Sequence, residues 1–376
     1  MKIILAFDSF KNCLSSPEIC SILSASILEL RPDWQIVQLP LGDGGEGTAR
    51  AITGALDGSM QKCVVHDPLF RTIEADFGLL PDNTAVLEMA SASGIELITS
   101  SERDPLRTTT YGTGEMLKYL AEKKNVRSFI IGIGGSATVD CGIGLLQALG
   151  VEFFDDNDQL LPIPANAYDI AKIRRINAEN ISDAIKKSKI CIASDVTNPL
   201  CGENGAARVF APQKGADGDA VEFLENNLKN FGMLSVKSGI ADNITSPGDG
   251  AAGGLGFALR NYLHAETTSG AELVLNILEF DKHLDGADWV ITGEGCSDFQ
   301  TCHGKLCSIA ANRAHRKNVP VILLSGALGE HAEELNNSFE AVLALTQKPC
   351  TLEEALSATQ ANLERMGRAL ANMLGK

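Results

Sequence analysis

The chain has 376 residues, of which 44% are hydrophobic and 21% charged, the balance of an ordinary globular protein long enough for two domains. Asp and Glu total 48 against 32 Lys and Arg, and the formal net charge of −16 opposes binding to nucleic acid or to an anionic membrane face. We therefore predict a small-molecule ligand, with neither nucleic acid nor membrane as a partner.

The cysteines and the N-terminal segment both indicate a cytoplasmic protein. None of the ten cysteines forms a CxxC pair, and a chain of this length without a secretory segment is expected to keep its thiols reduced. The apolar start MKIILAF is interrupted by Asp8 and Lys11, and no apolar run approaches the length of a membrane span. We expect a monomer or a homodimer.

Apolar runs of strand length occur near both ends of the chain, each followed by small or polar residues. They cover residues 3–7, 35–39, 289–292, 319–324 and 339–345. Helical patterns lie between them, over residues 16–30, where Pro17 follows a Ser cap, and over 305–317. Alternating strands and helices predict a doubly wound α/β domain with a parallel sheet, which binds ligands at the carboxyl ends of its strands.

The segment between the second and third of these strands is too long for a crossover connection. It contains hairpin-like runs at 61–65, 72–80 and 85–89, then strand candidates at 128–133 and 189–193. We expect a discontinuous domain of residues 1–56 and 286–376, interrupted by an inserted α/β domain of residues 57–285, with the active site in the cleft between them.

Polar loops follow the strands of the discontinuous domain, so acids and lysines are predicted to gather on one rim. Those side chains are Asp8, Lys11, Asp43, Glu46, Glu294 and Asp298. The stretch PLGDGGEGTAR at 40–50 has two interpretations. It is either a surface turn, or a strand-to-helix loop that presents an acid, and with it a metal, to a polar substrate. The glycines suit the second interpretation, because they let a ligand approach the main chain closely.

The stretch IIGIGGSATVDCGIGLLQALG at 130–150 reads as a strand, a glycine-rich loop and a helix. Free N–H groups at such a helix start favour phosphate, so the loop is a candidate phosphate cradle; a packing turn is the equal alternative. Residues 132–137 also satisfy G-x-G-x-x-A, with Glu152 and Asp155 further on, which leaves a nicotinamide-dependent oxidoreductase open.

Three further segments carry candidate chemistry. PGDGAAGGLGFALR at 247–260 is a second cradle or a site of tight helix packing. SDVTNPLCGENGAARVFAPQKGA joins Asp195 and Asn198 to Lys214, which suits magnesium binding or proton transfer followed by phosphate neutralisation. Arg71 in HDPLFR is a possible fork for a carboxylate.

Taken together, these loops resemble the bacterial glycerate kinase family of glyoxylate and glucarate utilisation. The matching segments, in chain order, are DSFKNCLSS, LGDGGEGT, DPLFR, TTTYGTGE, GIGGSATVDCGIG, DVTNPLCGENGAARVFAPQKGA, PGDGAAGGLG and VITGEGCSDFQTCHGK. The resemblance implies a flavodoxin-like domain interrupted by a second α/β domain, and ATP-dependent phosphorylation of D-glycerate to 2-phosphoglycerate or 3-phosphoglycerate. The chain departs from the family pattern at Asn12, Cys13, Val139, Cys141, Cys296 and Phe299.

On this hypothesis ATP·Mg²⁺ and glycerate meet in the cleft, and a glycerate hydroxyl attacks the γ-phosphate in line. Asp195 is the expected general base or metal anchor, and Arg71 is expected to hold the substrate carboxylate. The remaining expected roles are magnesium binding by Asp43 and Asp298, phosphate neutralisation by Lys11, Lys214 and Lys305, and phosphate cradling by Gly134, Gly135, Ser136 and Thr138. A non-catalytic glycerate- or nucleotide-binding homologue stays open as well.

Overall fold

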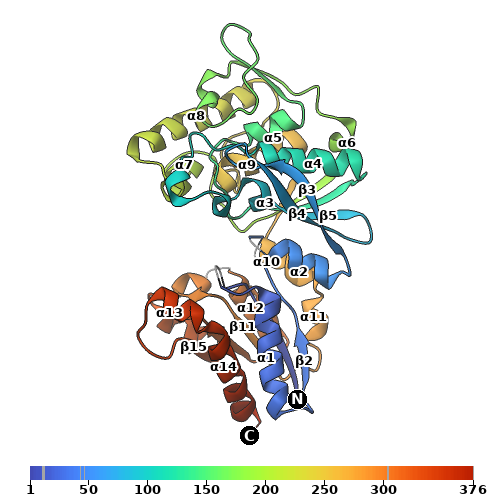
Figure 1. The fold of residues 1–376 in the computed structure, drawn as a ribbon, viewed down its shortest axis with the longest axis vertical. Coiled ribbons are helices and arrows are strands. Elements are labelled where there is room, and N and C mark those ends of the chain that lie inside the picture. Colours follow the sequence, from blue (N-terminus) through green and yellow to red (C-terminus); the bar gives the residue numbers. More distant parts are fainter. Residues whose placement is uncertain (11–12, 43, 46, 303–304, 376) are drawn as a thin grey trace. The chain divides into compact units, whose positions relative to one another are not determined.

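The computed structural model describes residues 1–10, 13–42, 44–45, 47–302 and 305–375. The chain forms two compact units, Met1–Asp43 with Gly270–Lys376, and Gly44–Ser269. The first unit is drawn in blue and in orange to red, and each unit has a sheet of its own (Figure 1).

The first unit is built on five parallel strands. They are β1 (Lys2–Phe7), β2 (Gln35–Gln38), β11 (Trp289–Gly293), β13 (Val321–Ser325) and β15 (Ala341–Ala344). Their order in the sheet is β2-β1-β11-β13-β15, and every neighbouring pair is parallel. Numbered within this unit, the order is 2-1-3-4-5, which is that of flavodoxin-like sheets. The predicted flavodoxin-like, doubly wound fold is confirmed.

Helices pack on this sheet because their apolar stripes match its buried faces. The unit's helices and its two short strands are α1 (Ser16–Leu30), α10 (Gly270–Ile277), α11 (Phe280–His283), β12 (Cys296–Ser297), α12 (Leu306–Arg316), β14 (Ala327–Leu328), α13 (Leu352–Ser357) and α14 (Thr359–Leu374). Helices α1 and α14 pack together, and Ile19 and Leu363 join Ile3 and Leu5 of β1 in one core. The capping box of Ser15 and Glu18 starts α1 at the residue that the Ser-Pro pattern predicts.

The second unit is built on a six-stranded sheet. Its strands are β3 (Ser59–His66), β4 (Thr72–Leu79), β5 (Thr84–Glu88), β6 (Ser128–Gly132), β9 (Lys189–Ala193) and β10 (Glu266–Thr268), in the order β10-β9-β6-β5-β4-β3. The hairpin β3–β4 and the pair β4–β5 are antiparallel, as the hairpin-like pattern predicts, whereas β5, β6, β9 and β10 run parallel.

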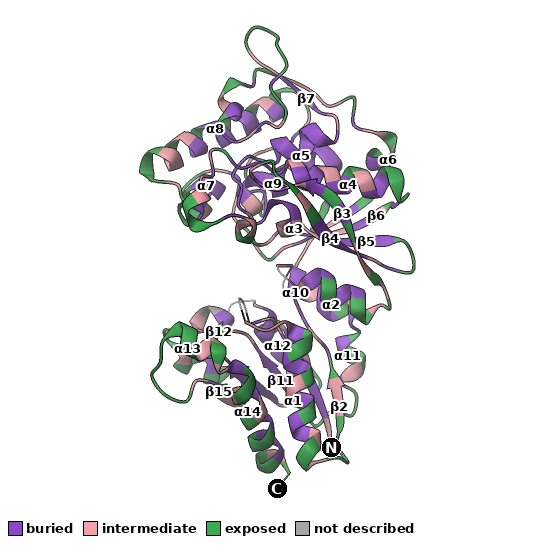
Figure 2. Cartoon of the chain, viewed as in Figure 1, coloured by how far each residue is buried: buried purple, intermediate pink, exposed green. Residues whose placement is uncertain are grey.

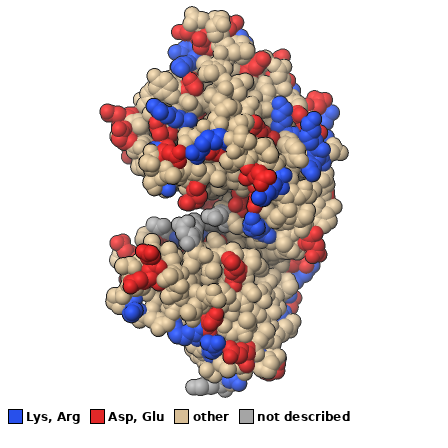
Figure 3. Space-filling view, viewed as in Figure 1, with Lys and Arg blue, Asp and Glu red and all other residues tan. Residues whose placement is uncertain are grey.

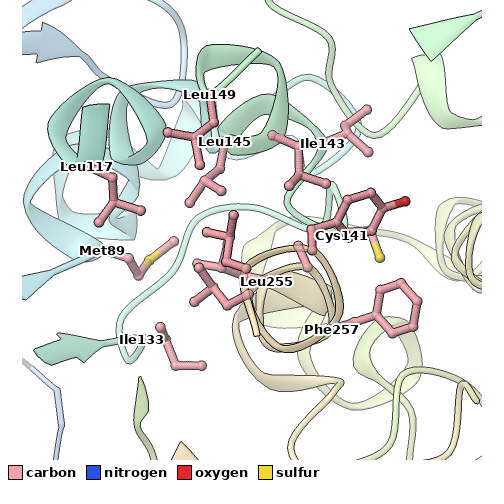
Figure 4. Close-up of a cluster of buried hydrophobic side chains, with 14 of the residues drawn as sticks. Met89, Leu117, Ile133, Cys141, Ile143, Leu145, Leu149, Leu255 and Phe257 are labelled. Carbon is pink, nitrogen blue, oxygen red and sulfur yellow. The ribbon is translucent and has the colours of Figure 1, made fainter. Parts of the chain in front are cut away.

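The helices of the second unit enclose a large apolar core. The unit's remaining elements are α2 (Thr48–Ala55), α3 (Ala90–Ser93), α4 (Tyr111–Lys123), α5 (Ile143–Ala148), β7 (Glu152–Phe154), β8 (Arg175–Asn177), α6 (Asp183–Lys186), α7 (Ala206–Phe210), α8 (Gly218–Lys237) and α9 (Ala251–Leu263). Leu117 of α4, Leu145 of α5 and Leu255 of α9 gather near Ile133, the first residue after β6 (Figure 4). The core therefore fixes the base of the glycine-rich loop.

The observed units differ from the expected domain limits at two segments. Helix α2 belongs with the second unit, because it packs on β3, β4 and β5, and a Cβ on Gly78 of β4 would lie 1.8 Å from Thr53 Oγ1. Residues 270–285 belong with the first unit, because α10 packs on α11 and α12. Both helices pack partly on elements some thirty residues further along the chain, β5 for α2 and α12 for α10.

The surface is polar and mixed in charge. Buried residues are concentrated along the strands and the inner sides of the helices (Figure 2). Lysines and arginines are interspersed with acidic residues on the face shown in Figure 3. None of the helices among the described residues is both long enough and apolar enough to span a membrane.

Replacement of Gly367 by valine should destabilise the first unit. A Cβ at Gly367 of α14 would lie 2.7 Å from Ser26 Cβ of α1, so the two helices must separate. We expect Gly367→Val to lower the free energy of unfolding by about 2 kcal/mol, the usual effect of overpacking. Ala369→Val, on the exposed face of the same helix, should change it by less than about 0.7 kcal/mol. Urea unfolding followed by circular dichroism measures both, and equal losses would contradict this packing.

Candidate active site

Two loops of the second unit begin side by side at the carboxyl edge of its sheet. Strands β6 and β9 are parallel neighbours whose last residues, Gly132 and Ala193, pair with each other. The loop 133–140 follows Gly132, and the loop 194–198 follows Ala193. Ligands bind at such edges in open α/β sheets.

The glycines of the 40–50 stretch close this edge by direct backbone contact. Gly134 N–H donates to Gly44 O at 3.4 Å. A Cβ on Gly44 would lie 2.4 Å from Ala193 O, and a Cβ on Gly132 would lie 2.4 Å from Gly44 O. The surface-turn interpretation is therefore wrong for Gly44, which is buried and has a φ of +88° that favours glycine. Asp43 and Glu46 lie outside the described residues.

A buried lysine amine holds the glycine-rich loop. Lys214 ends the 3₁₀ helix Pro212–Lys214 and is 2% exposed. Its Nζ donates to Ser136 Oγ at 2.6 Å and to Thr138 O at 2.7 Å. Three residues predicted to bind phosphate, Ser136, Thr138 and Lys214, thus lie together, although Lys214 is 78 positions from Ser136 and 76 from Thr138 along the chain.

The surroundings of Lys214 make its charge sensitive to ligands. Burial lowers the pKa of Lys214 to about 7, and the nearby Asp140 opposes this shift. Asp140 is itself fully buried, which raises its pKa, while hydrogen bonds from Thr110, Gly142 and Gly144 act in the other direction. An anion brought close to Lys214 would favour the protonated amine, so binding and protonation are coupled.

The loop has donors left over for a ligand. The Oγ1 of Thr138 is buried and has no hydrogen-bond partner among the described residues. The carbonyl of Gly135 and both backbone groups of Ala137 are used by residues 93–95 and Thr108. No acceptor within the described ranges binds the N–H groups of Gly135 or Ser136. Free N–H groups and a cation around a glycine-rich turn suit a phosphate.

The other polar loop of this edge brings Asp195 to the surface. Asp195 is exposed and lies two residues beyond the end of β9. Asn198 is used within its own loop, where its Nδ2 donates to Asn204 O at 2.8 Å. Asp195 therefore lies at the sheet edge that carries Ser136, and its role as a base or metal anchor stays a prediction.

The second glycine-rich stretch, at 247–260, serves packing. A Cβ on Gly253 would lie 2.1 Å from Thr138 O, and Cys141 N–H donates to Gly253 O at 3.0 Å. Asp249 accepts two hydrogen bonds from Arg260, at 2.7 and 2.8 Å. Burial raises the pKa of Asp249, and the arginine opposes that rise. The packing interpretation is favoured here, since these contacts support the far side of the Ser136 loop.

Arg71 already holds two carboxylates of the protein. Its Nε donates to Asp67 at 2.5 Å, its Nη1 to Glu102 at 2.8 Å, and its Nη2 to Leu97 O at 3.0 Å. Asp67 is 2% exposed and also accepts from backbone N–H groups of its own turn. This geometry favours a structural role, and the predicted contact with a substrate carboxylate stays a prediction.

In the first unit, Glu294 organises the loop after β11. Its Oε1 accepts from Thr301 Oγ1 at 2.6 Å and from Ser297 Oγ at 3.0 Å. Ser297 is hydrogen-bonded to Ser325, the last residue of β13, at 2.5 Å. In the same region Lys305 Nζ lies 3.7 Å from Asp298 Oδ1, so a predicted phosphate ligand and a predicted metal ligand are neighbours. Lys11 lies outside the described residues.

Asp140 is a residue of this site that the sequence prediction did not single out. Asp140 lies in the quoted segment GIGGSATVDCGIG, where an acid before glycine is a signal for an anchored turn. For metal, no group of three or more His, Cys, Asp or Glu side chains is arranged to hold an ion in the part of the chain that the structure describes.

Comparison with known proteins identifies the family of this chain. The model of the glycerate kinase family matches residues 3–375. The chain belongs to the glycerate kinase family. It is 39% identical to glycerate 2-kinase of Escherichia coli K12, over all of this chain and 98% of the relative. It is 37% identical to glycerate kinase of Bacillus cereus, over 99% of this chain and 97% of the relative.

A solved structure agrees with this membership. The crystal structure of a protein from Salmonella typhimurium LT2, named provisionally as glycerate kinase 2, has a TM-score of 0.86 and 38% identity, and the match covers all of this chain and 98% of that one. The chain is thus a kinase, which needs a nucleotide and a small-molecule substrate. The dinucleotide alternative has little support, because α5 begins at Ile143, well beyond Gly132, and Asp155 caps its own turn.

The burial of Lys214 predicts a pH dependence of stability. Below pH 7 the amine is protonated in both the folded and the unfolded state, so it does not make the free energy of unfolding depend on pH. Between about pH 7 and the ordinary lysine pKa of 10.5, the unfolded state binds the proton that the folded state has lost, and stability rises with pH. Relative to Lys214→Met, we expect the free energy of unfolding of the native protein to rise by up to about 1.4 kcal/mol per pH unit.

Urea unfolding at pH values of about 7, 8 and 9 measures how the free energy of unfolding changes with pH. Lys172→Met is the matched control, because Lys172 is a largely exposed lysine of the same unit that pairs with Asp169. Parallel curves for the native protein and Lys214→Met would contradict a neutral buried amine.

Proposed function

We propose that this protein phosphorylates D-glycerate with ATP and magnesium, and that the product is 2-phosphoglycerate. Family membership and the names of the relatives support the acceptor, and the Escherichia coli relative is named for the 2-position. The observation that carries the proposal is the buried amine of Lys214 on the Ser136 loop, because it is the group best suited to a phosphoryl oxygen.

The Ser136 loop would bind the phosphates of the nucleotide. Gly135 and Ser136 present main-chain N–H groups without an acceptor among the described residues, and Thr138 supplies a buried hydroxyl that also lacks a partner there. Gly134, whose N–H donates to Gly44 O, keeps its proposed place in the cradle as a residue without a side chain. Lys214 would gain full charge when phosphate oxygens arrive, so the site offers most positive charge when it is needed. Fixed donors aimed at developing charge supply most of the catalysis in phosphoryl transfer.

Asp195 is the proposed general base for the attacking glycerate hydroxyl. It is exposed at the edge that carries the Ser136 loop, and a carboxylate can accept the proton that the hydroxyl loses as the new P–O bond forms. Lys305 would stabilise the negative charge on phosphate oxygens. Lys11, which lies outside the described residues, has the same proposed role because of its place in the sequence. Arg71 remains a weaker candidate for the substrate carboxylate.

Magnesium suits the carboxylates near these loops. Carboxylate oxygens are its preferred protein ligands, and one or two of them usually bind it together with phosphate oxygens. Asp195, at the edge that carries the Ser136 loop, is the described residue of the second unit proposed to hold it. Asp298, which lies next to Lys305 in the first unit, and Asp43 remain candidates from the sequence. When bound, the ion would neutralise charge on the nucleotide. We further propose a cytoplasmic location, consistent with ten free cysteines, and a monomer or homodimer.

Phosphoryl transfer is tested directly by ADP release. We expect release from ATP·Mg²⁺ that depends on D-glycerate, and phosphorus NMR of the product should give the spectrum of 2-phosphoglycerate. A 3-phosphoglycerate spectrum would contradict the proposed position. Folded protein that releases no ADP with glycerate would contradict the proposed substrate.

The same assay tests Asp195. We expect Asp195→Asn to lower kcat by about a hundredfold or more, the usual contribution of a general base, with an unchanged unfolding transition. Asp183→Asn, at an acid that is 81% exposed, is the matched control and should retain native turnover. Native turnover in Asp195→Asn would remove its catalytic role.

A further inference from the structure

Arg103 lies next to the turn that follows Lys214 and forms no ion pair with any described residue. Gly215, which follows Lys214, has a φ of +102°, and a Cβ placed there would lie 2.3 Å from Arg103 O and 3.2 Å from Arg103 Cβ. The main chain and Cβ of Arg103 therefore lie directly against the turn that follows the buried amine. Its Nε is buried and has no hydrogen-bond partner among the described residues.

The acids beside Arg103 in the sequence are committed to other arginines. Glu102 is bound to Arg71 at 2.8 Å, and Asp104 pairs with Arg107 at 3.3 Å. Within the described part of the chain neither Arg103 nor Lys214 forms an ion pair. Two basic side chains without an ion pair among the described residues, on segments that touch at Gly215, are an unusual arrangement in a chain with a formal net charge of −16. A buried charge normally has a partner, because desolvation without one is unfavourable.

The unused donors of the loop lie around the same turn. Lys214 binds Ser136 and Thr138, and the Oγ1 of Thr138 is a second buried polar atom with no partner among the described residues. The segment that leads to Arg103 also runs along the loop, since Ile95 N–H donates to Gly135 O at 2.9 Å. A ligand at this place would meet a guanidinium, an amine and a hydroxyl, all of which can donate.

We propose that Arg103 and Lys214 form one oxyanion subsite, in which Arg103 is a binding residue for a phosphoryl group or a carboxylate. The planar guanidinium would supply a forked contact, and Lys214 a single charged one. The subsite itself is independent of turnover. The identity of the oxyanion bound during the reaction rests on the proposed function. Under that function the candidates are the phosphates of ATP and the carboxylate of D-glycerate.

Binding measurements on the full chain test the subsite. The variants are Arg103→Gln and, as the matched control, Arg107→Gln, since Arg107 is four residues away, 80% exposed and paired with Asp104. Isothermal titration with inorganic phosphate, ATP and D-glycerate, each alone, gives the dissociation constants. We expect Arg103→Gln to weaken at least one of them by about tenfold or more, the usual effect of losing a charge-assisted hydrogen bond, and Arg107→Gln to match the native protein.

The pattern of losses identifies the oxyanion. Weaker phosphate and ATP binding with native glycerate binding assigns a phosphoryl group, and the reverse assigns the carboxylate. Equal affinities in Arg103→Gln and Arg107→Gln, or no binding of any of the three by the native protein, would overturn the subsite. If Arg103→Gln does not fold, Arg103→Lys against Arg107→Lys replaces it, because lysine keeps the charge but not the fork; unchanged affinities in that pair would overturn the subsite equally.

The experiments can reject the subsite and the proposed function independently of each other. Loss of phosphate binding in Arg103→Gln, in a protein that releases no ADP with glycerate, would keep the subsite and reject the reaction. Glycerate-dependent ADP release with native Michaelis constants in Arg103→Gln would keep the reaction and reject the subsite.

Discussion

The buried amine of Lys214 is the interaction on which the candidate site depends. It joins a turn at residue 215 to a loop almost eighty residues earlier, through Ser136 and the main chain of Thr138. It adds two side-chain hydrogen bonds to the main-chain bonds that residues 93–95 make to the same loop. The amine gives up its hydration for two hydrogen bonds, which is why its pKa falls to about 7.

Close backbone contact is the second constraint, and glycine meets it. Gly44, Gly132 and Gly253 each approach a carbonyl so closely that a Cβ could not fit, and together they surround the Ser136 loop from both sides. The loop is therefore held by packed main chain, which leaves its free N–H groups available. A preorganised loop of this kind needs little rearrangement when a charged ligand binds.

The sequence predicts strands and helices well where the periodicity is strong. The flavodoxin-like sheet follows from five apolar runs, and α1 follows from its Ser-Pro start. The unit boundaries are less predictable, because the unit to which α2 or α10 belongs depends on tertiary packing that the local sequence pattern does not show. Arg71 shows the same limit at the site: its motif suits a substrate carboxylate, yet Asp67 and Glu102 already bind it, and no local pattern reveals that. For Arg103 the local sequence suggests an ordinary surface arginine between two acids. In the structure those acids, Glu102 and Asp104, pair with other arginines.

The protonation of Lys214 is the quantity that tests this account most directly. Lysine Cε and Nζ resonances, assigned with the Lys214→Met variant, can be followed by NMR as a function of pH with and without ATP. The account predicts a pKa of about 7 in the free protein and a clear rise when ATP is bound. A pKa that stays at the ordinary lysine value, or one that ATP leaves unchanged, would contradict it.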